Sequence, residues 1–257
     1  MKAAGLDIGS LTTKAVLLDG DKIASSVIIA SGEEAESTAR DAVVQLGCNG
    51  ATDVYVVSTG IGGKSISLGK QQKSITTCLA RGIHNLFPAA RMLIDLGAES
   101  ISIIKINDRG RISDWLGHDK CAAGTGIFLQ QMAKLMQMPL EEMATISLKA
   151  KGAAEITSTC AVFAESEVIS HVHRDPPTPR EEIVAGIYSS LVSRVMALAK
   201  RVGIEKEVAV SGGVALNTGL IKALEKELGF AVLVPEKPQL VAALGAAIIA
   251  GENIGRE

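Results

Sequence analysis

The segment DIGSLTTK, from Asp7 to Lys14, carries the residue types that a phosphate-binding turn needs. Gly9 allows the backbone to turn tightly at a strand end, and such a turn directs backbone N–H groups outward. Lys14 adds a positive charge, and the intervening serine and threonines offer hydroxyls. This set suits a triphosphate, with Asp7 holding Mg²⁺ through water because Mg²⁺ keeps much of its hydration shell. An ordinary hairpin with polar turn residues is the alternative.

An internal repeat strengthens the phosphate interpretation. The sequence LDIGSLTTKAVLL recurs as IDLGAESISIIKI, so that Asp95 and Gly97 align with Asp7 and Gly9. Each copy is followed by a turn and another short apolar stretch, which predicts strand, tight turn, strand, turn, strand. Repetition of a whole supersecondary unit predicts two lobes of similar topology. Two facing hairpins would form a cleft, which a lone hairpin would not.

The elements between and after these hairpins alternate helix and strand. Helices are expected over residues 35–47, 121–138 and 183–202, and strands over residues 53–59 and 207–211. This order predicts α/β lobes with mixed sheets around a nucleotide cleft. We place the lobe boundary near Pro88, giving lobes of residues 1–88 and 89–239. The last apolar helix, within residues 240–257, is expected to pack on the first lobe.

A third glycine-rich turn follows the strand expected at residues 207–211. Gly212 and Gly213 connect that strand to a helix starting near Asn217. A strand–Gly-Gly–helix turn lets a flat ring approach the backbone closely, whereas a plain strand-to-helix turn rarely needs two glycines.

Two other motifs are set aside. Residues 60–65, GIGGKS, contain Gly-Lys-Ser but have Ser58 where a P-loop needs its first glycine, so they are interpreted as a turn. His171 and His173 would face one side of a strand, as a metal site needs. They begin a polar, proline-rich segment, residues 171–182, which favours a solvated loop, and two further zinc ligands are missing.

Composition limits the classes of partner. The chain has 257 residues, a net charge of -2 and an apolar fraction of 47%, with only 3% aromatic residues. The core must therefore consist of Val, Ile, Leu and Ala, as in strands covered by helices. Without a basic patch we expect no nucleic-acid partner. Without a signal-like start or a run of roughly 18 apolar residues, we expect a cytoplasmic protein with no membrane partner.

The four cysteines are not expected to form disulfides in a reducing compartment. Cys121 and Cys160 each stand at the expected start of a helix, where the helix dipole lowers a thiol pKa. Neither belongs to a CxxC pair, so a complete four-thiolate set would require two chains. Small buried residues are the alternative for both. Cys48 and Cys78 are interpreted as packing residues.

Together these motifs resemble a known family. The two hairpins and the SGGV turn are similar to those of the acetate kinase, sugar kinase, heat-shock chaperone and actin superfamily, whose lobes have ribonuclease H-like topology. The segments DKCAAGTG, residues 119–126, and STCAVFAESEVIS, residues 158–170, resemble more closely the ATP-dependent activators of 2-hydroxyacyl-CoA dehydratases and the ATPase subunits of benzoyl-CoA reductase. The resemblance covers nearly the whole chain.

This resemblance implies a homodimer, or a heterodimer with a paralogue, that shares one [4Fe–4S] cluster. Cys121 and Cys160 of each subunit match its four ligands. Each subunit would bind ATP or ADP with Mg²⁺, and nucleotide turnover would shift the helices beside the cluster. A ferredoxin or flavodoxin would supply the electron, and a CoA-ester dehydratase or aromatic-CoA reductase would accept it at low potential.

The resemblance also implies residue roles. Asp95 and Asp7 are the catalytic candidates, and Asp95 would orient the attacking water. The candidate nucleotide-binding residues are Gly9, Ser10, Leu11, Thr12, Thr13, Lys14, Gly97, Glu99, Gly212, Gly213 and Asn217.

The second phosphate loop departs from the family pattern. The family usually has Asp-Ile-Gly-Gly-Gln-Asp, whereas this chain has Asp-Leu-Gly followed by Ala98, Glu99 and Ser100, and it has His118 where Asn is frequent. The departures concern the rate of hydrolysis and the identity of the partner more than nucleotide binding. Two other functions stay open: a small-molecule kinase of the same fold, and a regulatory ATP-binding module whose cysteines are structural.

Overall fold

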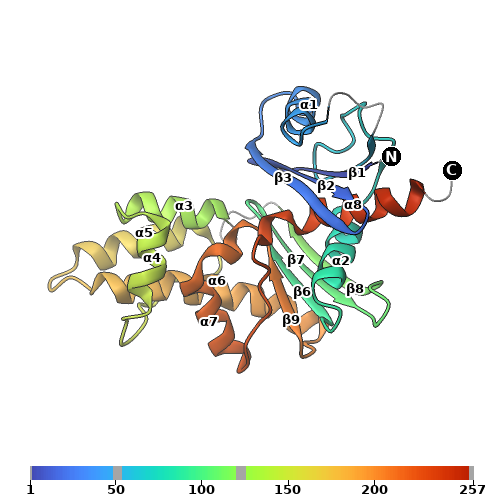
Figure 1. Cartoon of the computed structure of the whole chain (residues 1–257). Helices are drawn as coiled ribbons and strands as arrows, with labels where there is room; N and C mark the ends of the chain where they lie inside the picture. Colours follow the sequence, from blue (N-terminus) through green and yellow to red (C-terminus); the bar gives the residue numbers. More distant parts are fainter. Residues whose placement is uncertain (1, 49–53, 120–125, 255–257) are drawn as a thin grey trace. The chain divides into compact units, whose positions relative to one another are not determined.

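The computed structural model describes residues 2–48, 54–119 and 126–254, and it has two mixed sheets (Figure 1). The chain divides into two compact units. The first comprises Met1–Leu93, Ile104–Asp114 and Pro235–Glu257, and the second comprises Ile94–Ile103 and Trp115–Val234. The expected α/β class is confirmed.

The first sheet has strand order β3-β2-β1-β4-β5. Its strands are β1 (Lys2–Ile8), β2 (Thr12–Asp19), β3 (Lys22–Ala30), β4 (Val54–Thr59) and β5 (Gln71–Gln72). The first three form the expected antiparallel meander, and β4 pairs in parallel with β1. Side chains alternate along β1, so that Ala3 faces one core cluster while Ala4 and Leu6 face the other.

Helices cover both faces of this sheet. The helix α1 (Ala35–Gln45) supplies the cluster around Leu6, and α8 (Val241–Ile254) supplies the cluster around Ala3. Figure 1 shows α1 and α8 on opposite faces of the sheet. The other side of α8 packs on α2 (Ile75–Leu86). Because α8 lies between a sheet and a helix, it is apolar almost all round.

Glycines allow the close approach of α8 to its neighbours. A Cβ at Gly245 would lie 1.7 Å from the Cys78 carbonyl oxygen, and one at Gly82 would lie 2.1 Å from the Val241 carbonyl oxygen. A Cβ at Gly5 of β1 would lie 2.0 Å from the Ala243 carbonyl oxygen. Any side chain at these positions would force the backbones apart.

Replacing Gly245 by alanine is therefore expected to destabilise the protein by about 1–3 kcal/mol, the usual cost of overpacking. Gly251 of the same helix is the matched control, because its added Cβ would meet only the Ala3 Cβ, at 3.7 Å. Gly251→Ala is expected to be neutral or to stabilise the helix by up to about 1 kcal/mol. Thermal unfolding of both variants is the measurement. Equal midpoints for the two would contradict the tight α2–α8 packing.

The second sheet has strand order β8-β7-β6-β9. Its strands are β6 (Met92–Leu96), β7 (Ser100–Ile106), β8 (Ile112–Asp119) and β9 (Val208–Ser211). The chain returns beside β9 in parallel through Leu233, whose N–H donates to the Val208 carbonyl. The repeat thus produces a second meander, as expected.

Helices dominate the rest of the second unit. They are α3 (Gly126–Leu135), α4 (Leu140–Ser147), α5 (Ala161–His173), α6 (Arg180–Val202), the 3-10 helix η2 (Gly213–Leu216) and α7 (Thr218–Leu228). The expectation of no membrane-length apolar segment needs correction, because α6 is long and apolar enough to cross a membrane, judged by length and composition alone. The most apolar part of α6 is 67% buried within the protein, which is typical of a core helix.

Candidate functional site

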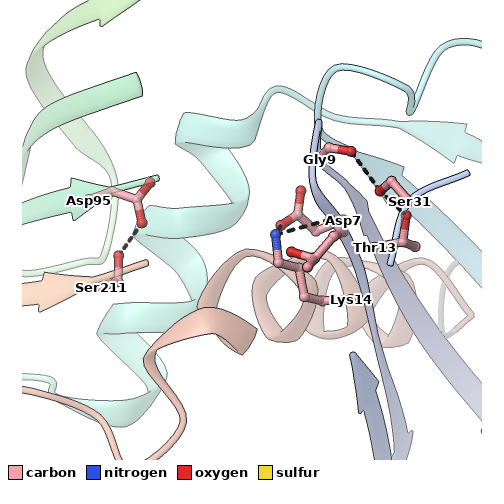
Figure 2. A network of polar contacts seen from close by, with 8 residues as sticks. Asp7, Gly9, Thr13, Lys14, Ser31, Asp95 and Ser211 are labelled. Atoms are coloured by element: carbon pink, nitrogen blue, oxygen red, sulfur yellow. Dashed lines mark hydrogen bonds and ion pairs between the residues drawn. The ribbon is translucent and has the colours of Figure 1, made fainter. Parts of the chain in front are cut away.

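The first hairpin holds a buried carboxylate at the end of β1. Asp7 is 5% exposed, and its Oδ2 lies 3.4 Å from Nζ of Lys14, its partner on β2 (Figure 2). Among the described residues, Oδ1 of Asp7 has no hydrogen-bond partner. Burial raises the pKa of Asp7 above its usual range, against the opposing effect of the Lys14 charge. A cation beside the unpaired oxygen would favour the charged carboxylate, so the site fits Mg²⁺.

The tip of this hairpin is a tight turn. The Gly9 N–H donates to the Thr12 carbonyl at 3.1 Å, and Ser10 and Leu11 at the tip are exposed. A Cβ at Gly9 would lie 2.9 Å from the Thr12 carbonyl oxygen, which explains the glycine. The exposed tip is free to present its backbone to a ligand.

The Thr13 side chain lies inside the fold, whereas the sequence predicted a hydroxyl available to phosphate. Its side chain is fully buried, and its hydroxyl lies 3.0 Å from the Ser31 hydroxyl, which itself donates to the Gly9 carbonyl at 2.8 Å (Figure 2). Thr13 and Ser31 therefore brace the turn from behind instead of offering a hydroxyl to phosphate. Ser31 follows β3 and was missed, because no local motif marks it.

The GIGGKS segment buttresses the same hairpin. It forms a turn, as expected, and its Gly62 N–H donates to the Ile8 carbonyl at 3.1 Å. Gly60 has a φ of 85°, and a Cβ there would lie 2.7 Å from Asp7 Oδ1. Only glycine fits this conformation so close to the carboxylate.

Cys48 and Cys78 are buried packing residues in the structure. Burial raises the pKa of Cys78 to about 12, although the Thr59 hydroxyl opposes the shift. Burial also raises the pKa of Cys48. Both thiols therefore stay protonated and are poor metal ligands.

The second hairpin repeats the geometry of the first. The Gly97 N–H donates to the Ser100 carbonyl at 2.9 Å, as the Gly9 N–H does to the Thr12 carbonyl. Asp95, one residue from the end of β6, accepts a 2.5 Å hydrogen bond from the Ser211 hydroxyl at the end of β9 (Figure 2). No local motif links Ser211 to Asp95, because the two residues are 116 positions apart in the chain.

The turn of the second hairpin is bonded to the start of α3. The N–H groups of Gly126 and Ile127 donate to the carbonyls of Gly97 and Ala98, each at 3.0 Å. These are two of the helix N-terminal donors that α3 cannot satisfy internally. The hairpin is thus joined to the helix that directly follows residues 120–125, a segment containing Cys121 and lying outside the described residues.

Glu99 is exposed at the tip of this second turn. A carboxylate beside the phosphates of a nucleotide would repel them, so Glu99→Gln is expected to lower the dissociation constant for ATP about two- to fivefold. Calorimetric titration with a non-hydrolysable ATP analogue measures the effect, and Glu141→Gln, at an exposed position of α4, controls for net charge. Unchanged affinity, or equal gains in both variants, would place Glu99 away from the phosphates.

The Gly-Gly turn lies directly after Ser211. Gly212 has a φ of 89°, and a Cβ there would lie 2.2 Å from the Leu96 carbonyl oxygen, so the ends of β9 and β6 are in close contact. Gly213 begins η2, which the sequence did not predict.

Asn217 is engaged within the fold. Its Oδ1 accepts the Leu220 N–H at 3.0 Å as the N-cap of α7, and its Nδ2 donates to the Tyr188 hydroxyl at 2.8 Å. Burial raises the pKa of Tyr188 to about 12, so this hydroxyl stays protonated. Asn217 therefore positions the start of α7, and its side-chain amide is already occupied.

Cys160 is the N-cap residue of α5 and is half-buried. Its side chain makes no capping hydrogen bond within the part of the chain that the structure describes. The residues before it are held to α6: the Thr157 carbonyl accepts from Ser190 Oγ at 2.7 Å, and the Arg194 guanidinium donates to the Thr159 carbonyl at 3.0 Å. The thiol therefore stands on an anchored backbone at a helix N-terminus.

The histidine pair differs from the strand arrangement considered above. His171 and His173 lie in the last turn of α5, where residues two apart point in different directions. His171 is engaged by the Thr178 hydroxyl at 3.0 Å and by the Glu155 carbonyl at 3.2 Å. Among the described residues, no group of three or more His, Cys, Asp or Glu side chains could hold a metal ion.

The geometry defines an α/β protein with two repeated hairpins, each with an aspartate one residue before the end of its first strand. Comparison with known proteins agrees: residues 4–250 match the BadF/BadG/BcrA/BcrD ATPase family. The chain belongs to this ATPase family.

Similar proteins extend the comparison. The 2-hydroxyisocaproyl-CoA dehydratase activator of Clostridioides difficile is 41% identical over 97% of this chain and 95% of its own length. The solved structure of the activator of the 2-hydroxyisocaproyl-CoA dehydratase from Clostridium difficile with bound ADPNP has a TM-score of 0.90 at 38% identity, covering 100% of this chain and 98% of that one. An archaeal actin homolog, at 15% identity and a TM-score of 0.60 over 98% and 100% of the chains, shares the actin-like fold.

Proposed function

We propose that this protein hydrolyses ATP to deliver a low-potential electron to a partner enzyme that acts on a CoA ester. The partner would be a 2-hydroxyacyl-CoA dehydratase or an aromatic-CoA reductase, and the donor a ferredoxin or flavodoxin. The protein would act in the cytoplasm. Membership of an ATPase family and similarity to dehydratase activators support this proposal.

The two hairpins would bind the phosphates of ATP. Asp7 has an unpaired buried oxygen suited to Mg²⁺, and Lys14 balances its charge. Asp95 sits at the equivalent position of the repeat and accepts a hydrogen bond from the Ser211 hydroxyl. Environments that differ in this way separate the roles of two carboxylates. Asp7 would therefore hold the metal through water, and Asp95 would orient the attacking water.

Cys160 has features that a cluster ligand needs. Cys160 is half-buried at the N-terminus of α5, on a backbone segment that Ser190 and Arg194 of α6 hold in place. Val162 and Phe163 in the next turn are 65% and 63% exposed, an apolar surface that a second subunit would cover. Cys121 and Cys160 of two subunits would complete four thiolates. A [4Fe–4S] cluster held there would carry one electron at a time.

The connection between the second hairpin and α3 is the observation that carries the coupling. A shift of the phosphates would move the carbonyls of Gly97 and Ala98. Through their hydrogen bonds, these carbonyls would move the first two residues of α3. Residues 120–125 directly precede that helix. Nucleotide turnover would thus act on the segment that contains Cys121, in the manner of a two-state switch.

Anaerobic purification tests the proposal. We expect a brown protein, about four irons per dimer after reconstitution, and a dimer mass under native conditions. A colourless protein that stays monomeric after anaerobic reconstitution would overturn it. Such a protein would be a kinase if it phosphorylated small molecules, and a regulatory module if it bound ATP without catalysis.

A further inference from the structure

Asp95 accepts a hydrogen bond from Ser211, a residue that is far from it in the chain. Ser211 is the last residue of β9, and β9 lies next to β6 in the sheet. The Ser211 side chain is fully buried, and its hydroxyl donates to Asp95 Oδ1 at 2.5 Å, the length of a charge-assisted O–H···O⁻ bond (Figure 2). The hydroxyl therefore has one fixed direction, toward the carboxylate.

The backbone leaves Ser211 little freedom. Gly212 follows with a φ of 89°, and a Cβ on it would lie 2.2 Å from the carbonyl oxygen of Leu96, the residue after Asp95. Close contact of the two strand ends at Gly212 fixes the spacing between the backbones that carry Ser211 and Asp95. A side chain locked by such packing can hold a reacting group in a productive orientation.

The second hairpin lacks the lysine that pairs with the aspartate of the first. Lys14 pairs with Asp7 in the first hairpin, whereas the equivalent position of the second hairpin is Ser102. A hydroxyl from another strand holds the carboxylate in place without adding a charge.

We propose that Ser211 is a positioning residue for ATP hydrolysis, because its hydroxyl fixes one oxygen of Asp95 and so orients the carboxylate toward the attacking water. The inference rests on the proposed role of Asp95 in hydrolysis. Misplacing a catalytic group by about 1 Å can cost about 100-fold in rate. Removing the hydroxyl should therefore reduce turnover while leaving ATP binding to the hairpins intact.

Steady-state ATPase assays on purified variants test the inference. Ser211→Ala is expected to lower kcat about 10- to 100-fold with KM for ATP within about twofold, and Ser211→Thr, which keeps the hydroxyl, to restore most of the rate. Ser147→Ala is the control: it removes a hydroxyl that bonds the Ala144 carbonyl at 2.9 Å in α4, so its activity should match the unaltered protein. Calorimetric binding of a non-hydrolysable ATP analogue confirms that each variant is folded.

The double variant with Asp95→Asn distinguishes the role of Ser211 from the role of Asp95. If Ser211 acts through Asp95, then Ser211→Ala should cause no further loss of kcat in the Asp95→Asn background. A normal rate for Ser211→Ala, or fully additive losses, would overturn the positioning role. A normal rate for Asp95→Asn alone would instead overturn the proposed role of Asp95 itself.

Discussion

Replacing Asp95 by asparagine is expected to lower ATP hydrolysis about 10²- to 10⁴-fold while the affinity for ATP changes little. A positioned carboxylate that orients and activates water contributes about this factor, and asparagine is similar in size but is not a base. Asp95 is half-buried and hydrogen-bonded to Ser211, so the replacement keeps a polar group in the same place.

Single-turnover phosphate release, with analogue binding measured in parallel, separates chemistry from binding. Asp108→Asn, at an exposed position in the turn between β7 and β8, is the matched control and should behave like the unaltered protein. If Asp95→Asn hydrolysed ATP at the normal rate, the assignment of the second hairpin as the catalytic one would be wrong.

Replacing Cys160 by serine is expected to abolish the cluster while sparing ATP binding. Serine matches cysteine in shape but is a poor ligand for iron, since soft thiolates are what iron–sulfur clusters require. One lost cysteine per subunit removes two of four ligands in a shared site. The same result is expected for Cys121→Ser.

Iron content and visible absorption after anaerobic reconstitution measure the loss, and calorimetry measures ATP binding. Cys48→Ala is the control, because Cys48 packs beneath α1 and its pKa is raised by burial. Retention of four irons per dimer by Cys160→Ser would show that other residues hold the metal.

Much of the fold was predictable because the sequence repeats a local unit. Both hairpins close by the same backbone hydrogen bond, from Gly9 to Thr12 and from Gly97 to Ser100. A hairpin depends on residues close together in the chain, so its motif is visible in one sequence. The strand–Gly-Gly turn at Gly212 was predictable for the same reason.

The helices α2 and α4 were not predicted. Two threonines and Gly82 in α2 have low helix propensity, and α4 is too short to display a clear periodicity. Packing decides both: Gly82 contacts the backbone of α8, and Met143 of α4 is fully buried.

The side-chain roles within the site were harder to predict than its position. Thr13 and Asn217 have the residue types that bind nucleotides, yet the fold uses Thr13 to brace a turn and Asn217 to cap a helix. Conversely, Ser211 reaches Asp95 from 116 residues away. Such contacts depend on the assembled sheet, which a single sequence does not reveal.

Electron paramagnetic resonance of the dithionite-reduced protein, with and without Mg-ATP, tests whether ATP binding is coupled to an iron–sulfur cluster in this protein. It examines the cluster and its coupling to nucleotide in one sample. We expect the signal of a reduced [4Fe–4S] cluster whose line shape changes when Mg-ATP binds, since the second hairpin is bonded to α3, the helix that follows residues 120–125 in the chain. A protein that binds ATP but gives no such signal, or a signal that nucleotide leaves unchanged, would contradict the coupling of ATP to electron transfer.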